Sequence, residues 1–296
     1  MKKKYIVSAV AGACALCALV GFLLWQPSLQ QPETVPNAQG ATPVAPQARL
    51  DPTEEHLTLL LDYKAPLAER IKALRAIKRE LAAEEVAELR TLVRRTAENA
   101  TVRNDVLSLL ERQPNPPDDL STDLIAIWRD RGESAVIRDY ALQHLAHVMP
   151  FDAHKKAIED TLIEASKLKE GTFPGTAMLS MNRISSQSER IRAAMRDVAV
   201  KTTLDENADR NVAVTAMQVA RAAGDTTVLD RARELAAKEG ELVRLRMSSI
   251  NTLGELGRAG DLPLLEKLTR HREDRISRVA KYSLKRLKKK LGKPVR

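Results

Sequence analysis

The fold is decided by the stretch VRLRMSSINTLGELG at residues 243–257, which a turn and a second apolar run, RAGDLPLLEKL, follow directly. Ser249 and Leu253 lie four positions apart in the first run, and Arg246 precedes Ser249 by three. Residues four apart share one face of a helix, where a small side chain lets a second helix come close and a larger one fills the layer. The stretch therefore predicts two short helices packed around a Gly-Asp turn.

The same pair, a small residue followed four positions later by a larger apolar one, recurs along the chain at a period of roughly 35 residues, which is typical of paired-helix repeats. One such helix pair cannot bury its apolar face alone, so neighbouring pairs must stack. We therefore predict an all-α fold, a right-handed α-solenoid of about six to seven helix pairs. The pairs are Ala73/Ile77, Val106/Leu110, Ala141/Leu145, Ala177/Met181, Ala213/Met217, Ser249/Leu253 and Ala280/Leu284.

An arginine stands three positions before the small residue in most of these repeats. We expect these arginines to pair with acids or carbonyl groups of adjacent repeats, although a basic stripe for an acidic partner is the alternative. Pro174 replaces the arginine in one repeat, where it either starts a helix or marks a hinge or binding loop. We call the arginines the arginine ladder, and they are Arg70, Arg103, Arg138, Arg210 and Arg246.

The run from Arg246 through Leu253-Gly254 to Gly260-Asp261 resembles the short bacterial HEAT-repeat pattern. The resemblance covers roughly residues 66–291 and is strongest in the last third. It implies binding through a curved helical surface. Some HEAT-like proteins are chromophore lyases and others are scaffolds, so the resemblance implies no particular reaction.

The N-terminus predicts a membrane anchor. Residues 1–4 carry three lysines and should be cytoplasmic, and the uncharged run at residues 5–25 is long enough as a helix to span a hydrocarbon core of roughly 30 Å. The Pro-rich residues 26–50 predict an extended linker, and residues 51–296 then form the repeat domain outside the inner membrane, in the periplasm. Cleavage or lipidation near Cys14 is the alternative to an uncleaved anchor.

The composition excludes several classes of protein. Hydrophobic residues make up 44% of the chain, enough for a buried core, whereas aromatic residues make up only 3%, which argues against a β-sandwich or barrel. Cys14 and Cys17 both lie near the N-terminus, so the rest of the chain holds no disulfide framework or cysteine metal cage. Because no P-loop, Gly-x-Gly-x-x-Gly or Gly-x-Ser-x-Gly motif is present either, we predict that the protein is not an enzyme.

Histidines give the only candidate metal ligands. His144 and His147 lie at i and i+3 on one predicted helix face, and His154 follows nearby. Zinc sites need three or four converging ligands, and no His-Glu-x-x-His motif occurs, so we expect ordinary histidines, no metal and no cofactor.

The C-terminus predicts a basic capping helix at residues 275–291. Ile276, Ala280 and Leu287 share one face of this helix. Lysines and arginines on the other face would cap the repeat domain, or would contact anionic lipid head groups or an acidic partner. The candidate contact residues are Arg286, Lys288, Lys289 and Lys290.

These observations together predict a non-enzymatic scaffold, anchored in the bacterial inner membrane, that binds an envelope or membrane protein on its repeat surface. We expect no nucleic acid and no small-molecule substrate. The alternative function is that of a lyase-type or metal- or ligand-binding protein.

Overall fold

The computed structural model describes residues 52–169 and 171–292, and within these ranges all regular structure is helical, with fourteen α-helices and no strand. This confirms the all-α prediction and is consistent with an α-solenoid. The helices are α1 Pro52–Leu61, α2 Leu67–Ala76, α3 Ala83–Arg94, α4 Ala100–Glu111, α5 Leu120–Arg129, α6 Ala135–Val148, α7 Lys155–Ser166, α8 Phe173–Ile184, α9 Glu189–Leu204, α10 Arg210–Ala222, α11 Leu229–Ala237, α12 Val243–Leu256, α13 Leu262–Leu268 and α14 Asp274–Lys290.

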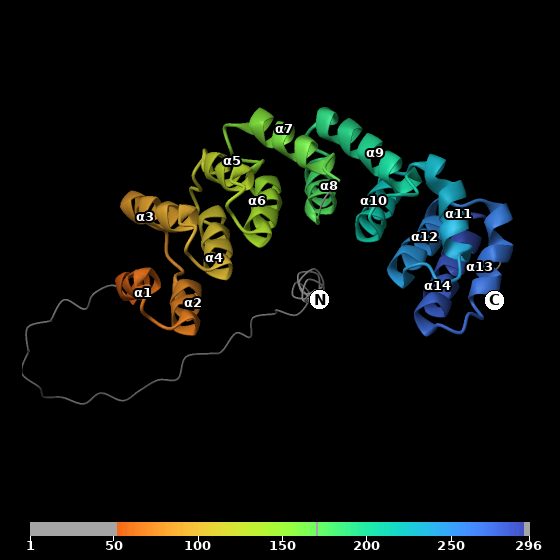
Figure 1. The fold of residues 1–296 in the computed structure, drawn as a ribbon, viewed down its shortest axis with the longest axis horizontal. Coiled ribbons are helices and arrows are strands. Elements are labelled where there is room, and N and C mark those ends of the chain that lie inside the picture. Colours follow the sequence, from red (N-terminus) through yellow and green to blue (C-terminus); the bar gives the residue numbers. More distant parts are fainter. Residues whose placement is uncertain (1–51, 170, 293–296) are drawn as a thin grey trace, which may run out of the picture. The chain divides into compact units, whose positions relative to one another are not determined.

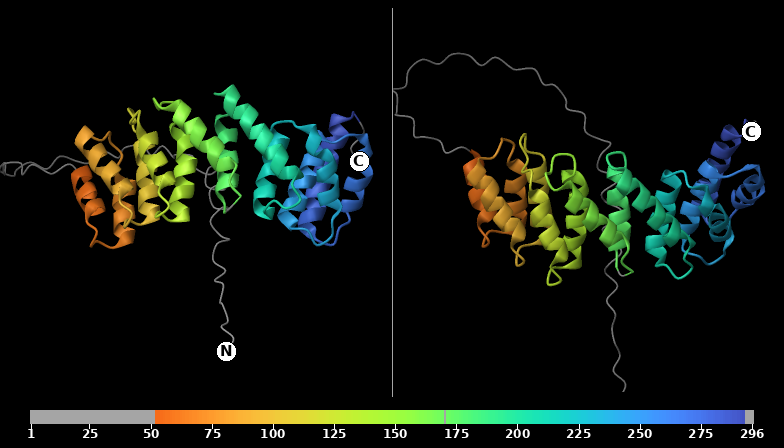
Figure 2. Two further views of the ribbon diagram at one scale, coloured as in Figure 1. Left: turned by 45° about the horizontal axis from the view of Figure 1, so that its top comes forward. Right: turned by 90° about the horizontal axis from the view of Figure 1, so that it is seen from above.

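The helices pack in consecutive pairs. Each odd-numbered helix contacts the even-numbered helix that follows it, from α1 with α2 to α13 with α14 (Figure 1). The even-numbered helices also contact one another in order from α2 to α14, and α3, α5, α7 and α9 do the same. Figure 2 shows the helices following one another in sequence order from two further directions. Seven helix pairs are thus present, in agreement with the predicted six to seven.

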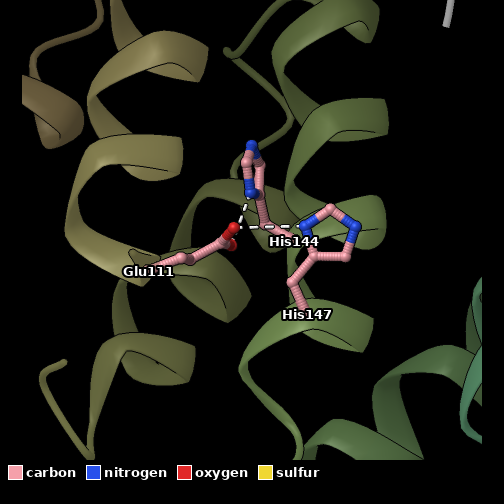
Figure 3. A group of neighbouring side chains, drawn as sticks. All are labelled: Glu111, His144 and His147. Atoms are coloured by element: carbon pink, nitrogen blue, oxygen red, sulfur yellow. Dashed lines mark hydrogen bonds and ion pairs between the residues drawn. The ribbon is translucent and has the colours of Figure 1, made fainter. Parts of the chain in front are cut away.

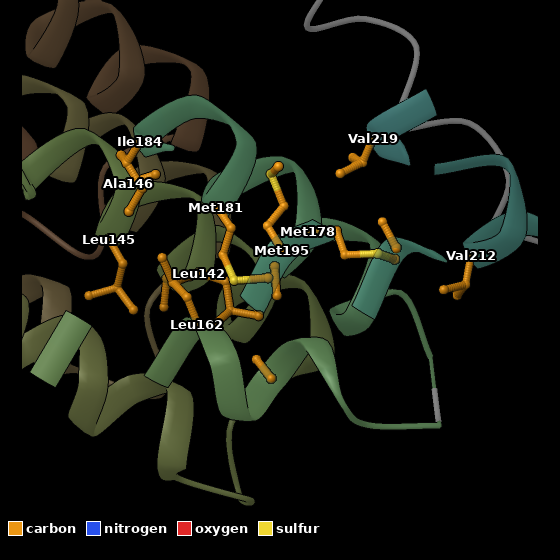
Figure 4. Packing of buried hydrophobic residues seen from close by; sticks show 14 of the residues in the cluster. Leu142, Leu145, Ala146, Leu162, Met178, Met181, Ile184, Met195, Val212 and Val219 are labelled. Atoms are coloured by element: carbon orange, nitrogen blue, oxygen red, sulfur yellow. The ribbon is translucent and has the colours of Figure 1, made fainter. Parts of the chain in front are cut away.

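The repeated small and large residues form the core. All of them are buried except Leu284, which is half-buried. Figure 4 shows this packing where Leu142 and Leu145 of α6 lie near Met178 and Met181 of α8. One cluster of apolar side chains runs from Leu57 in α1 to Leu287 in α14 because each pair buries its apolar face on the next.

The arginine ladder joins neighbouring elements. The Nε atoms of Arg70 and Arg103 donate to the carbonyl oxygens of Leu60 (2.8 Å) and Val93 (2.7 Å), each ten residues earlier in the chain. The same spacing recurs for Arg138 with Trp128 (2.9 Å) and for Arg246 with Ala236 (3.3 Å). Each of these arginines therefore ties the helix that carries it to the end of the preceding helix.

Two members of the ladder also reach forward to the next repeat. Arg70 forms two hydrogen bonds with the carboxylate of Glu98, at 3.1 and 2.6 Å, and Arg103 does the same with Glu133, at 2.8 and 2.6 Å. A third member, Arg210, lies 3.6 Å from Glu241. Each acid stands just before the first residues of the next even-numbered helix, so the guanidinium groups of Arg70 and Arg103 each link three elements.

The turns between the helices agree only in part with what the sequence predicts. Gly224 adopts a left-handed φ of 70°, as expected for a helix end, and Asp225 caps the following turn by accepting the Thr227 N–H. In the Gly-Asp turn predicted from the sequence, Gly260 does not adopt this left-handed conformation, because its φ is not positive. Asp261 instead accepts the backbone N–H of Arg258 at 2.7 Å, which closes a 3-10 turn before α13. Pro174 lies in the first turn of α8, as a helix start would place it.

The predicted cytoplasmic residues 1–4, membrane span 5–25 and linker 26–50 lie outside the described residues. Among the helices of residues 52–169 and 171–292, none combines the length and apolar character that crossing a bilayer requires. The predicted capping helix at 275–291 corresponds to α14, which begins at Asp274 and ends at Lys290.

Candidate metal centre

The candidate site lies between α4 and α6. Glu111 is the last residue of α4, while His144 and His147 lie one turn apart on α6 and so point to the same side. The two helices pack together because Leu107 and Leu110 of α4 are buried in the same apolar cluster as α6. This packing brings the end of α4 against the C-terminal part of α6, where Figure 3 shows Glu111 beside His144 and His147.

The three side chains converge on one point. His144 Nδ1 lies 2.5 Å from Glu111 Oε1, and His147 Nδ1 lies 3.1 Å from Glu111 Oε2. One candidate ligand atom of each residue lies within 4.8 Å of the other two. The two imidazole rings meet edge to face, with centroids 5.5 Å apart. A carboxylate and two imidazoles thus face a common small volume.

Two further side chains orient the imidazoles. His144 Nε2 lies 3.1 Å from Asn104 Oδ1, and His147 Nε2 lies 2.8 Å from Arg183 Nη1. Arginine can only donate, so His147 Nε2 accepts and the ring proton of His147 sits on Nδ1, facing Glu111. The Asn104 oxygen is suited to accept Nε2–H of His144, which directs the other nitrogen of His144 toward Glu111.

The three side chains of the site differ in their exposure to solvent. The side chains of His144 and Glu111 are 4% and 9% exposed, whereas that of His147 is 34% exposed. Burial alone would raise the pKa of Glu111, but hydrogen bonds from His144 and His147 outweigh burial and lower it. Glu111 is therefore held as a carboxylate beside the buried His144, and His147 is the member of the group that solvent reaches most easily.

A carboxylate with two imidazoles is a donor set that metals of intermediate softness favour. Catalytic zinc sites use three protein ligands and keep a position open for water or substrate. Two histidines and one carboxylate also bind non-haem iron(II) with open positions. Magnesium and calcium prefer all-oxygen ligands, so this set favours a transition metal over either of them.

His154 does not join this group. It lies at the N-cap position of α7, and its backbone N–H donates to Asp152 Oδ1 at 2.7 Å. Asp152 itself accepts from the backbone N–H and the hydroxyl group of Ser121, at 2.8 and 2.7 Å. Nearness in sequence to His147 therefore did not indicate a shared site.

Sequence reasoning missed Glu111, although a signal for it was present. Glu111 precedes His144 by 33 residues and His147 by 36, which is close to one repeat. Positions one repeat apart lie side by side on neighbouring even-numbered helices. An acid one repeat before a histidine pair was therefore the pattern to look for.

The predicted contact residues of the C-terminus mostly bind their own domain. Arg286 pairs with Glu255 at 3.0 Å, and Lys288 pairs with Glu266 at 3.0 Å. Lys290 Nζ donates to the carbonyl oxygens of Glu255 (2.9 Å) and Gly257 (3.3 Å). Lys289 is exposed. Three of these four side chains thus fasten α14 onto α12 and α13.

No family model matches the chain, and no curated protein matches it. Among solved structures, human deoxyhypusine hydroxylase in complex with glycerol is similar at 13% sequence identity and a TM-score of 0.36. The match covers 80% of this chain and 96% of that one. A similarity at this level leaves the activity of this chain open.

The group of Glu111, His144 and His147 overturns the prediction that the protein is not an enzyme. That prediction rested in part on the lack of three converging metal ligands, and the structure brings three together on two adjacent helices. The physical reason for the error is that the third ligand comes from the preceding repeat.

Proposed function

We propose that the protein binds a divalent transition-metal ion through Glu111, His144 and His147 and uses it for metal-assisted chemistry. The observation that carries this proposal is the convergence of the three ligand atoms within 4.8 Å, with Asn104 placed behind His144. The metal would lie between the two imidazole nitrogens and the carboxylate, in place of the hydrogen bonds that now join them. A bound metal of this class polarises a substrate oxygen or activates a water molecule.

Metal analysis of the full-length chain tests the proposal. The chain is stripped with a chelator, incubated separately with Zn²⁺, Co²⁺ and Fe²⁺, and its metal content is measured by mass spectrometry. We expect about one ion per chain, since the three ligands form one set. Thermal unfolding supplies a second readout, because a ligand at 100 times its Kd stabilises the fold by about 2.7 kcal/mol.

Matched variants distinguish metal binding at this site from general effects of a substitution on the fold. Glu111→Gln and His147→Ala should lose stoichiometric metal, and Asn104→Ala should weaken metal affinity about 10- to 100-fold. His154→Ala is the control and should keep the metal, since His154 lies outside the group. A wild-type chain that retains none of the three ions, or equal retention in wild type and Glu111→Gln, would overturn the proposal.

We also propose that the repeat domain is tethered at the bacterial inner membrane and faces the periplasm, where it meets an envelope or membrane protein. The three lysines at residues 2–4 and the uncharged run at 5–25 support this placement. A C-terminal alkaline phosphatase fusion should be active and should sediment with membranes. Deleting residues 2–25 should abolish both properties, and an inactive full-length fusion would contradict the proposal.

A further inference from the structure

Arg183 of α8 lies beside the candidate site, next to the Nε2 atom of His147. Its Nη1 atom lies 2.8 Å from His147 Nε2, and no ion pair joins Arg183 to an acid within residues 52–169 and 171–292. Some other exposed arginines of the repeats do have such partners, for example Arg75 with Asp105 at 3.1 Å and Arg190 with Glu159 at 3.0 Å. Among the described residues, the Arg183 guanidinium is therefore hydrogen-bonded to an imidazole nitrogen and to no carboxylate.

Metal binding would remove this one acceptor. If the metal takes His147 through Nδ1, the ring proton moves to Nε2, and an N–H group then faces the N–H groups of Arg183. If the ring turns and binds through Nε2, the lone pair that Arg183 uses is taken by the metal. In both cases Arg183 loses its hydrogen-bond acceptor beside the metal.

A metal-loaded site would also carry uncompensated positive charge. A divalent ion, the Glu111 carboxylate and the Arg183 guanidinium together sum to a formal charge of about +2. A guanidinium presents its donors in a planar fork that matches a carboxylate or a phosphate, and such pairs are stronger than neutral hydrogen bonds. An oxyanion could therefore bind the metal at an open position and Arg183 at the same time.

From this we infer that the site takes an oxyanion, a carboxylate or phosphate group of a substrate or co-ligand, between the metal ion and Arg183. The inference rests on the proposed metal binding. It assigns Arg183 as the residue that selects anionic ligands, because its guanidinium becomes free when the metal binds. Figure 3 shows Glu111 beside one ring nitrogen of His147, and Arg183 hydrogen-bonds to the other ring nitrogen.

Cobalt spectroscopy tests this inference directly. The full-length chain is loaded with Co²⁺, whose visible absorption reports changes of ligand, and is titrated with acetate, oxalate and inorganic phosphate in separate experiments. We expect a saturable spectral change with at least one of these anions. If a carboxylate binds more tightly than phosphate, the site prefers a carboxylate group, and if phosphate binds more tightly, it prefers a phosphate group.

Variants of Arg183 make the inference falsifiable. Arg183→Gln should weaken anion affinity at least about tenfold, the loss expected for one charge-assisted pair of about 1.4 kcal/mol. It should bind Co²⁺ at least as tightly as wild type, since the competing donor is gone. Arg183→Lys should recover part of the anion affinity. The control Arg190→Gln, on α9 and paired with Glu159, should behave like wild type.

The outcomes distinguish the two proposals. Co²⁺ binding with no anion response, or with equal anion affinity in wild type and Arg183→Gln, overturns the role of Arg183 and leaves the metal site intact. A failure of wild type to bind Co²⁺ overturns both.

Discussion

Arg103 is almost wholly buried, with its side chain only 2% exposed, and so is its partner Glu133 at 5%. Removing a charged group from water costs several kcal/mol, and the cost is offset here by hydrogen bonds to one carbonyl group and both carboxylate oxygens. Removing either Arg103 or Glu133 should therefore be strongly destabilising, because the charge of the other residue would remain buried without a partner.

Arg103→Ala should therefore destabilise the protein by about 3–5 kcal/mol. The remaining Glu133 carboxylate and the carbonyl oxygen of Val93 would both lose their donors. Chemical denaturation at neutral pH, followed by circular dichroism, measures the free energy of unfolding. The result contradicts this account of the ladder if the loss is below about 1 kcal/mol.

Two controls accompany this measurement. Arg75→Ala removes an exposed pair, since the Arg75 side chain is 68% exposed, and should cost less than about 1 kcal/mol. The double variant Arg103→Met with Glu133→Leu removes both charges and should recover much of the stability lost in Arg103→Ala.

Asp139 of α6 is the opposite case, a half-buried acid without a cation among the residues that the structure describes. Its carboxylate accepts from the hydroxyl groups of Thr172 (3.1 Å) and Thr176 (2.8 Å) and from the Gln143 amide (3.4 Å). Burial raises the pKa of Asp139, and these hydrogen bonds only partly oppose that rise. The charged form is therefore less favourable in the folded protein than in the unfolded chain.

Asp139→Asn should raise the thermal unfolding temperature at pH 7, because it keeps an acceptor for the two threonines and removes the charge. Gln143 can turn its amide to face the new NH₂ group. The gain should shrink as the pH falls toward the pKa of the wild-type Asp139, since wild type then becomes neutral as well. A lower unfolding temperature at pH 7 would refute this, and exposed Asp197→Asn is the control.

At the residue scale, the sequence identified part of the candidate site. His144 and His147 were found because i and i+3 positions share a helix face whatever the tertiary structure is. Glu111 and Arg183 come from the neighbouring helices α4 and α8, and their places depend on how one repeat is rotated against the next. Local spacing carries no information on that rotation, which is why it selected His154 instead.

Close packing of helices depends on single small residues, and Gly254 of α12 is the clearest instance. A Cβ atom at Gly254 would lie 2.5 Å from Ser283 Cβ and 2.7 Å from Ser283 Cα in α14. These distances are well inside van der Waals contact, and the second involves backbone that cannot turn aside. The glycine therefore sets how closely the last helix approaches α12.

Gly254→Ala should destabilise the protein although alanine favours a helix. Overpacking costs about 1–3 kcal/mol, which exceeds the gain of roughly 0.5–1 kcal/mol in helix propensity. Gly260→Ala is the matched control, because nothing lies within 4 Å of a Cβ atom there and its φ is not positive. We would measure both by thermal unfolding, and equal stability of the two variants would count against this packing argument.

The number and order of the helix pairs were predictable because the repeat places a small and a large apolar residue at a regular interval, and nearly all of these residues are buried in the structure. The turns were less predictable. Gly224 and Gly260 occupy equivalent places in the sequence, yet only Gly224 is left-handed. At Gly260 the side chain of Asp261 accepts the Arg258 N–H, a local contact between residues three apart, and also binds Arg233 of α11 at 2.6 Å. The Gly-Asp pattern specifies neither of these side-chain contacts, so it did not predict the backbone conformation.

Across the described repeats, a second series of buried acids links neighbouring units in the same way as the ladder. Arg90 binds Asp123 at 2.7 Å, Arg196 binds Asp225 at 2.6 Å, and Arg233 binds Asp261 at 2.6 Å. Hydrogen bonds and nearby arginines hold the pKa values of several such acids below their ordinary range, among them Glu98, Asp225, Glu241 and Asp261. Since repeat proteins are stabilised by contacts between neighbouring units, protonation of these acids weakens several interfaces at once.

The molecule should therefore lose stability on acidification. Burial alone would raise the pKa of Asp261, but hydrogen bonds from Arg233 and the Arg258 N–H outweigh burial and lower it. An acid with a lowered pKa in the folded state contributes stability that is fully present above its unfolded pKa of about 3.9. That contribution is lost as the pH falls from there through the lower folded pKa.

The stability of Asp261→Asn should be lower than that of wild type at pH 7 and should depend less on pH below about 4. Asp230→Asn is the matched control, because Asp230 pairs with the same Arg233 but its side chain is 96% exposed. Unfolding free energies measured between pH 7 and pH 3 should fall in parallel for wild type and Asp230→Asn, and an identical slope for Asp261→Asn would show that the buried acids do not set the acid limit of the fold.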